Sequence, residues 1–206
     1  IPVCHVEAGN RFGTLDSPEY RASLNQIWQP GFTLQNAIGN GGSMFSPVQL
    51  VNYCATIANG GTRYRPHFVK TVKSADYSET VLENGAEVIL ETGFSSNTLA
   101  TVRRGMELVG SKGYCSYAFK DLPVSAAAKT GTSQVDRTIN GYRVTTNNGF
   151  LITYAPADNP QIAICIAAEG AGSGSSLATI AASVYDYYFN EMGNLDAPEA
   201  ENQLLA

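Results

Sequence analysis

The chain has 206 residues, the length of one ordinary domain or of part of a larger one. Hydrophobic residues make up 44 %, enough to form a core, which excludes intrinsic disorder for most of the chain. The formal charge is −5 and no basic cluster is present, so a nucleic-acid-binding role is excluded. The longest uncharged stretch, 22–62, is interrupted by Asn, Gln, Gly and Pro, and we expect no transmembrane segment. The chain begins at Ile1 without a basic, apolar leader, so we expect a processed protein or a piece of a longer one.

The first 45 residues are predicted to be loop-rich, because turn signals occur at Asp16-Ser17-Pro18 and at Pro30-Gly31. The clearest helix follows them. Ser46-Pro47-Val48-Gln49 combines a serine N-cap, a proline at the first helical position and a glutamine at the third, which is a capping box. Apolar residues then recur at helical spacing until Gly60-Gly61, where we expect the helix to end.

Hydrophobic periodicity and turn residues predict the remaining elements. In chain order these are a strand over His67–Lys73, a charged surface stretch over Asp76–Glu91, a helix over Asn97–Val109, a loop over 110–117, antiparallel strands over Phe150–Tyr154 and Ile162–Ala168, a helix over Ser176–Phe189, and a frayed tail from Asn190. Because Ile162–Ala168 is apolar on both faces, we expect it to be a central, doubly covered strand. The order indicates an α+β fold in which helices cover an antiparallel sheet.

Several catalytic motifs can be tested directly against the sequence. A Ser-His-Asp site is disfavoured, since there are only two histidines, His5 and His67, and no G-x-S-x-G elbow. A phosphate loop is disfavoured because Ala128 precedes Lys129 where a Walker motif has glycine. A carboxylate pair for glycoside hydrolysis is not excluded, but no motif selects one.

One string of residues carries recognisable chemistry: Ala128-Lys129-Thr130-Gly131-Thr132-Ser133. In a strand, positions 129 and 131 face one way while 130 and 132 face the other. Gly131 would let a ligand approach the backbone, and an edge strand would offer N–H groups to an extended peptide. The lysine and the threonine hydroxyls suit a carboxylate. A surface turn explains these common residues about as well.

Other short motifs in the sequence favour the interpretation of this string as a ligand-binding strand. Together with the string itself, these landmarks are Ala37–Gly41, Ser46–Leu50, Ala58–Gly61, Arg65–His67, Met106 and Lys129–Thr132, in that order along the chain. With them, residues 37–189 resemble the carboxy-terminal part of a class B penicillin-binding protein transpeptidase domain. The resemblance implies the penicillin-binding, serine β-lactamase-like fold, present only as its carboxy-terminal portion. Residues 1–189 would form that portion, with 1–45 as a lead-in, 46–189 as helices and sheet, and 190–206 as a tail.

The resemblance also implies a mechanism and a role for each residue of the string. In the family, a serine attacks the penultimate D-Ala carbonyl of a peptidoglycan stem peptide, and β-lactams acylate the same serine. Lys129 would supply positive charge and a proton relay, and the Thr132 backbone N–H would be an oxyanion-hole donor. Thr130, Gly131, Thr132 and Ser133 would bind the substrate or the β-lactam. No cofactor is implied for this catalysis.

The family's nucleophile motif, S-x-x-K, is absent, because none of the five lysines has a serine three residues before it. Ser95-Ser96-Asn97 spells S-x-N but lies out of the family's order, so Ser95 is predicted to start a helix.

Two hypotheses about the whole protein remain. The chain is part of a transpeptidase whose amino-terminal remainder carries S-x-x-K and S-x-N, or it is a non-catalytic relative that binds cell-wall peptides or another protein.

Each hypothesis has consequences for partners and behaviour. For a transpeptidase the resemblance implies peptidoglycan stem peptides, β-lactam antibiotics and a cell-wall synthesis complex as partners. It also implies the extracytoplasmic face of the bacterial membrane, with an amino-terminal anchor helix outside this chain. We expect the chain alone to be insoluble or molten, and inert to a fluorescent penicillin, since a sheet without its partner strands exposes apolar surface.

The four cysteines divide into two pairs. Cys54 and Cys165 lie in apolar periodic segments and are predicted core residues. Cys4, His5 and Cys115 lie in predicted loops and would furnish three ligands of a tetrahedral structural zinc site. A Cys4–Cys115 disulfide and two free thiols are comparable alternatives.

Overall fold

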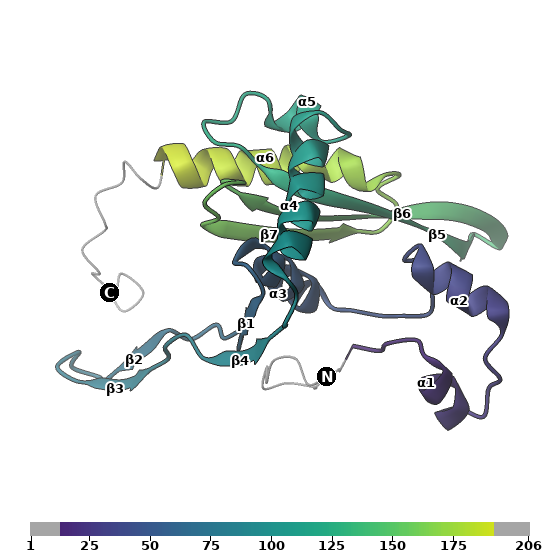
Figure 1. Ribbon diagram of the computed structural model, residues 1–206, viewed down its shortest axis with the longest axis horizontal. Helices are drawn as coiled ribbons and strands as arrows, with labels where there is room; N and C mark the ends of the chain where they lie inside the picture. Colours follow the sequence, from purple (N-terminus) through teal and green to yellow (C-terminus); the bar gives the residue numbers. More distant parts are fainter. Residues whose placement is uncertain (1–12, 192–206) are drawn as a thin grey trace. The chain divides into compact units, whose positions relative to one another are not determined.

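The computed structural model describes residues 13–191 (Figure 1). Contacts divide the chain after Leu99 into two compact units, called here the first and the second unit. Each unit has its own helices and antiparallel strands, so the predicted α+β class is confirmed.

Three helices form the first part of the first unit: α1 (Pro18–Ser23), α2 (Pro30–Ala37) and α3 (Pro47–Ala58). All begin with proline, whose missing N–H costs nothing at the first helical position. The Ser17 hydroxyl caps α1 by accepting from the Tyr20 N–H at 3.1 Å. The predicted turns at Asp16-Ser17-Pro18 and Pro30-Gly31 are therefore wrong, because both prolines start helices. The capping box of α3 is confirmed, with both of its hydrogen bonds present.

Two short ribbons complete the first unit. Strand β1 (Thr62–Tyr64) pairs with β4 (Val88–Glu91), and β2 (Thr71–Lys73) pairs with β3 (Thr80–Glu83). The strand predicted over His67–Lys73 is wrong in its first half, since only its last three residues pair. The predicted stretch Asp76–Glu91 is exposed almost throughout but contains β3 and β4. Strand β3 pairs with the nearby β2 and β4 pairs with the more distant β1, and the charges along this stretch reveal neither pairing.

A polar hub joins the segments of the first unit that precede α3. The Asp16 side chain is 1 % exposed and accepts hydrogen bonds from Arg21 Nη2 and from the Gly42 N–H, both at 2.9 Å. The Asp16 N–H donates to Ser43 Oγ at 3.0 Å. The Arg21 guanidinium also lies 4.5 Å from the centre of the Phe32 ring. One carboxylate thus ties α1 and α2 to the loop before α3.

The second unit combines helices with an antiparallel sheet (Figure 1). Its elements are α4 (Ser96–Ser111), α5 (Ser116–Phe119), β5 (Ala127–Ile139), β6 (Tyr142–Ala155), β7 (Ile162–Ala168), the 3₁₀ turn η1 (Gly174–Leu177), α6 (Ala178–Asp186) and the π turn η2 (Tyr187–Glu191). The helices predicted over Asn97–Val109 and Ser176–Phe189 are confirmed to within a few residues. The loop predicted over 110–117 is wrong at both ends, because α4 continues into it and α5 begins within it.

The described sheet has the order β5-β6-β7 and is antiparallel throughout. The expected antiparallel pairing of the last two strands is confirmed, but β7 lies at an edge and β6 is central. The prediction of a central strand over Ile162–Ala168 is therefore wrong for residues 13–191. Strands β5 and β6 form one long hairpin around Asn140-Gly141, whose φ angles of 52° and 83° are those of a type I′ turn.

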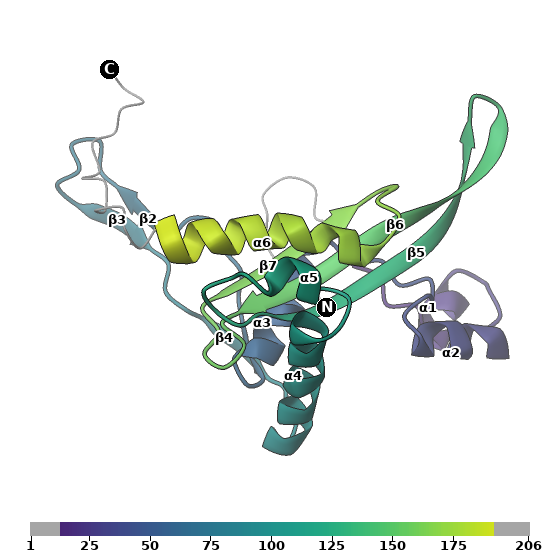
Figure 2. The same cartoon turned by 90° about the horizontal axis from the view of Figure 1, so that it is seen from above.

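Helix α6 covers one face of this sheet, as Figure 2 shows from above. The core between them holds Ala128, Leu151, Ala178 and Tyr185, all fully buried. Cys115, which was predicted to lie in a loop, is also fully buried in this core. The core thus joins residues of β5, β6 and α6 in one cluster.

Candidate functional site

The Lys129–Ser133 string lies on β5, as its strand reading predicted. Among residues 13–191, β5 pairs on one side only, with β6. Lys129 and Thr132 are exposed, while Thr130, Gly131 and Ser133 are half-buried. The structure therefore brings all five predicted residues to one open strand edge.

Two side chains of the string already make defined contacts. Lys129 Nζ donates to the Thr130 carbonyl oxygen at 2.5 Å, so the ammonium is folded back along its own strand. Thr132 Oγ1 accepts from the Gly174 N–H at 3.3 Å. The alternation of the strand puts Thr130 and Thr132 on the face that carries α6, because Ala128 belongs to the core beneath that helix.

Chemically, this edge is suited to an extended ligand that carries a carboxylate. It combines an ammonium, two hydroxyls and the unpaired backbone groups of an edge strand. Gly131 adds no side chain that would hold a ligand away from the backbone. The edge offers charge and hydrogen bonds.

The predicted zinc site is not supported. Cys4 and His5 lie outside the described residues. Cys115 is fully buried, and burial raises the pKa of its thiol, which disfavours the thiolate that zinc binds. Residues 13–191 contain no group of three metal-ligating side chains. Of the other cysteines, Cys54 is fully buried, as predicted, and Cys165 is half-buried.

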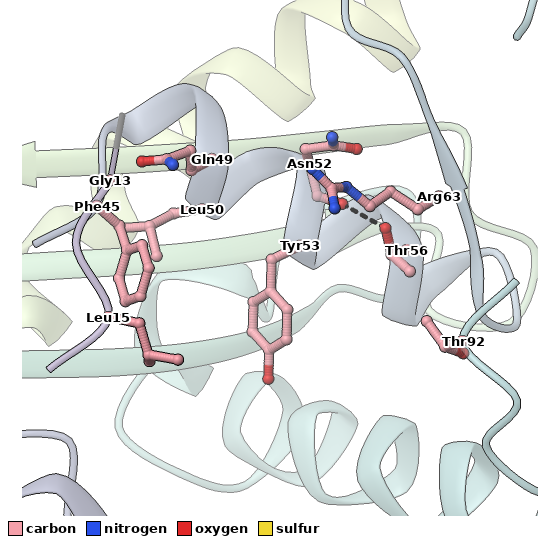
Figure 3. A pocket seen from close by; sticks show the side chains of 10 residues that line it. All are labelled: Gly13, Leu15, Phe45, Gln49, Leu50, Asn52, Tyr53, Thr56, Arg63 and Thr92. Atoms are coloured by element: carbon pink, nitrogen blue, oxygen red, sulfur yellow. Dashed lines mark hydrogen bonds between the residues drawn. The ribbon is translucent and has the colours of Figure 1, made fainter. Parts of the chain in front are cut away.

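A separate pocket of about 490 Å³ lies in the first unit (Figure 3). Its lining residues come chiefly from α3 and from the segments beside it: Gly13, Leu15, Phe45, Gln49, Leu50, Asn52, Tyr53, Thr56, Arg63 and Thr92. Only Arg63 and Tyr53 among them are titratable, and the Thr56 hydroxyl is engaged with the Asn52 carbonyl at 2.7 Å. The pocket is apolar and offers no nucleophile paired with a base.

Comparison with known proteins identifies the family to which the chain belongs. The family model described as "Penicillin binding protein transpeptidase domain" matches residues 6–186. The chain therefore belongs to the penicillin-binding protein transpeptidases, and its relatives place it in class B. The resemblance drawn from the landmarks is thus confirmed.

Two curated relatives illustrate the similarity. Penicillin-binding protein 2A of Bacillus subtilis is 35 % identical over 148 residues, which cover 66 % of this chain and 20 % of the relative. The peptidoglycan D,D-transpeptidase MrdA of Haemophilus influenzae is 30 % identical over 178 residues, covering 80 % of this chain and 27 % of the relative. The chain therefore spans about a quarter or less of the length of these proteins.

Solved structures agree on the fold. Penicillin-binding protein PBP2 of Pseudomonas aeruginosa, solved in complex with WCK 5153, has a TM-score of 0.71 and 30 % identity, covering 94 % of this chain and 42 % of that one. PBP2 of Helicobacter pylori, solved with MreC, has a TM-score of 0.73 and 24 % identity, covering 91 % of this chain and 32 % of that one. The predicted penicillin-binding fold, present in part, is confirmed. Within residues 13–191, no helix is long and apolar enough to cross a membrane.

The sequence analysis did not identify the residues outside Lys129–Ser133 that contact β5. Gly174 lies against β5, and Arg137 on β5 pairs with Glu169 after β7 at 2.9 Å. The two glycines of Gly172-Ser173-Gly174 are the sequence signal that favours a close backbone approach here.

Proposed function

We propose that this chain forms the Lys-Thr-Gly wall of a peptidoglycan D,D-transpeptidase active site. The observation that carries the proposal is the placement of Lys129-Thr130-Gly131-Thr132 on an open strand edge, in a chain that belongs to this transpeptidase family. An open edge accepts an extended peptide by backbone hydrogen bonding, and a stem peptide is such a ligand.

Each residue of the string takes a role in this proposal. Thr130 and Thr132 hydrogen-bond the terminal carboxylate of the stem peptide or the carboxylate of a β-lactam, while Gly131 and Ser133 border the ligand. The Thr132 backbone N–H donates to the oxyanion that forms at the attacked carbonyl. Lys129 turns from the Thr130 carbonyl towards the incoming serine and supplies positive charge and a proton relay.

The nucleophile comes from an amino-terminal remainder of the same protein that carries S-x-x-K and S-x-N. Its serine oxygen attacks the penultimate D-Ala carbonyl, and the terminal D-alanine leaves with the serine proton. An amino group of a neighbouring peptidoglycan strand then attacks the acyl-enzyme, and the serine leaves with the proton of that amino group. The proposed setting is the extracytoplasmic face of the cell membrane, within a cell-wall synthesis complex. The solved complex between the Helicobacter pylori relative and MreC supports the existence of such assemblies. No cofactor enters this chemistry.

The test is covalent labelling of the intact protein by a fluorescent penicillin. Lys129→Ala should lower the acylation rate about 10²- to 10⁴-fold, the range associated with losing a positioned proton-transfer group. Lys112→Ala, at an exposed lysine of the same unit, is the matched control and should label as the unchanged protein does.

The alternative is that the protein is a non-catalytic relative of the transpeptidases that binds cell-wall peptides. This alternative is compatible with a chain that contains no S-x-x-K motif. An intact protein that binds stem peptide but forms no covalent penicillin adduct would establish it. Normal labelling of Lys129→Ala would instead contradict the role given to the lysine.

A further inference from the structure

The loop 169–176, between β7 and α6, is fastened to the hairpin and to α5 at four points. Glu169 pairs with Arg137 at 2.9 Å, the Gly170 N–H donates to Asn148 Oδ1 at 3.2 Å, the Gly172 N–H donates to the Asn147 carbonyl at 3.2 Å, and the Tyr117 hydroxyl donates to the Ser175 carbonyl at 3.0 Å. All four of these partners lie outside Lys129–Ser133. The loop therefore has a fixed position from which it can act on that string.

Gly174 is the residue of this loop that reaches β5. It is buried, and its φ is not among the positive values, so conformation alone does not require glycine there. Space does: a Cβ on Gly174 would overlap the carbonyl oxygens of Gly131 and Phe150, and would lie 2.9 Å from the Gly131 nitrogen. Glycine at 174 thus allows the loop backbone to rest directly on the backbone of the Lys-Thr-Gly strand.

A second glycine contact lies next to the first. A Cβ on Gly149, the cross-strand partner of Thr132, would lie 2.9 Å from the Ser173 carbonyl oxygen. Two glycines on neighbouring segments therefore permit the close approach that places the Gly174 N–H 3.3 Å from Thr132 Oγ1.

This hydrogen bond constrains the Thr132 hydroxyl. A threonine hydroxyl has one proton to donate and two lone pairs to accept with. Because the Gly174 N–H occupies a lone pair, the proton is directed away from Gly174 and is available to an acceptor. A carboxylate only accepts hydrogen bonds, so a hydroxyl held in this way is matched to it.

We infer that Gly174 is a positioning residue of the transpeptidase site, which holds Thr132 as a hydrogen-bond donor to the ligand carboxylate. This inference rests on the proposed function. Gly174 itself touches neither the ligand nor the reacting atoms. It acts through Thr132, so its effect should depend on whether the ligand has a free carboxylate.

The experiment compares acylation of the intact protein by a penicillin and by the methyl ester of the same penicillin. Gly174→Ala should lower the acylation efficiency of the free acid about 10- to 100-fold, the scale of a displacement of about 1 Å at a reacting site. The ester has already lost the carboxylate and should slow much less, so the acid-to-ester ratio should fall. Gly105→Ala is the matched control, because a Cβ there meets nothing within 4 Å.

A milder variant covers the case in which Gly174→Ala does not fold. Tyr117→Phe removes the hydroxyl that holds Ser175 but adds no atom. It should lower the acid-to-ester ratio in the same direction by a smaller factor. Tyr114→Phe, at a tyrosine that is 79 % exposed, should leave the ratio unchanged.

The outcomes separate this inference from the proposed function. Equal slowing of acid and ester in Gly174→Ala and Tyr117→Phe, or no slowing of either, would overturn the positioning role while wild-type labelling still supports the transpeptidase. A wild-type protein that neither compound acylates would contradict the proposed function, and the positioning role would fall with it.

Discussion

The two units bury their apolar side chains to very different extents. Among residues 13–191, the first unit contributes four of the buried hydrophobic side chains and the second unit thirteen. Large hydrophobic side chains that are exposed are more numerous in the first unit, which has eighteen of them against nine in the second. The second unit is therefore organised around an apolar core, whereas the first has little core of its own in the described chain.

What holds part of the first unit in place is polar. The Asp16 carboxylate gathers Arg21 and the Gly42 N–H, and the Asp16 backbone binds Ser43. Such a hub holds the segments of the first unit in place by directed hydrogen bonds. The second unit gains stability mainly from burying apolar surface away from water. The two units should consequently respond to different perturbations.

The largest expected effect is on the core of the second unit. Leu151 is fully buried, so Leu151→Ala should lower the free energy of unfolding by about 2–5 kcal/mol. Leu34 in the first unit is 71 % exposed, and Leu34→Ala should change it by no more than about 0.5 kcal/mol. Urea denaturation of the intact protein, followed by circular dichroism, measures both. Equal losses would break the contrast between the units.

A smaller effect is expected from the buried hydrogen bonds that link Tyr185 of α6 to the sheet. The Tyr185 hydroxyl donates to Thr153 Oγ1 at 2.9 Å, and Thr153 donates onward to the Ala127 carbonyl at 2.8 Å. Tyr185→Phe should cost about 1–2 kcal/mol in the same denaturation experiment. Tyr187→Phe, at a tyrosine 47 % exposed, should cost nothing measurable. A neutral Tyr185→Phe would show that packing alone holds this helix.

The smallest expected effect is a local acid sensitivity of the first unit. The hydrogen bond from Arg21 holds the pKa of Asp16 below its ordinary value of 3.8. A lowered folded-state pKa means that the carboxylate stabilises the fold above the ordinary value, and that this stabilisation is lost as the pH falls through the folded-state pKa. Trp28, the only tryptophan, lies beside Phe32 and should report the loss by fluorescence below pH 3.8.

Asp16→Asn should remove that acid transition from the Trp28 signal. The control is Asp76→Asn, because the pKa of Asp76 is lowered to about 2 by Ser74 and Ser78 within its own turn. That change should leave Trp28 unaffected. An unchanged acid transition in Asp16→Asn would show that the hub does not organise the first unit.

Local signals in the sequence predicted part of the fold well and part of it poorly. The capping box at Ser46 fixed the start of α3, because all of its hydrogen bonds are made within four residues. The same reasoning applied to Ser17-Pro18 would have found α1. The Asn140-Gly141 pair is a strong local signal for the tight turn that joins β5 and β6. Strands β1 and β4 pair over the long separation from Thr62 to Glu91, which no local pattern encodes, whereas β2 and β3 are neighbours in the sequence.

The residues of the candidate site also differ in how well the sequence predicts them. Lys129–Thr132 could be found because the string is contiguous in sequence and follows the other landmarks in a fixed order along the chain. Gly174 could not, since its importance arises from contact with Gly131 and Thr132, about forty residues earlier. Cys115 was misplaced for a related reason: its glycine- and tyrosine-rich surroundings suggest a loop, but the fold buries it beneath α6.

The two outer strands of the described sheet differ in a way that bears on handling the protein. Native edge strands commonly carry charges or proline, which discourage pairing with another molecule. Strand β5 carries Lys129 on its open edge, but β7, Ile162–Ala168, has neither a charge nor a proline. In a protein in which no further strand covers β7, copies should therefore associate through this edge as concentration rises. A lysine introduced on that strand, such as Ala167→Lys, is a rational way to obtain soluble material.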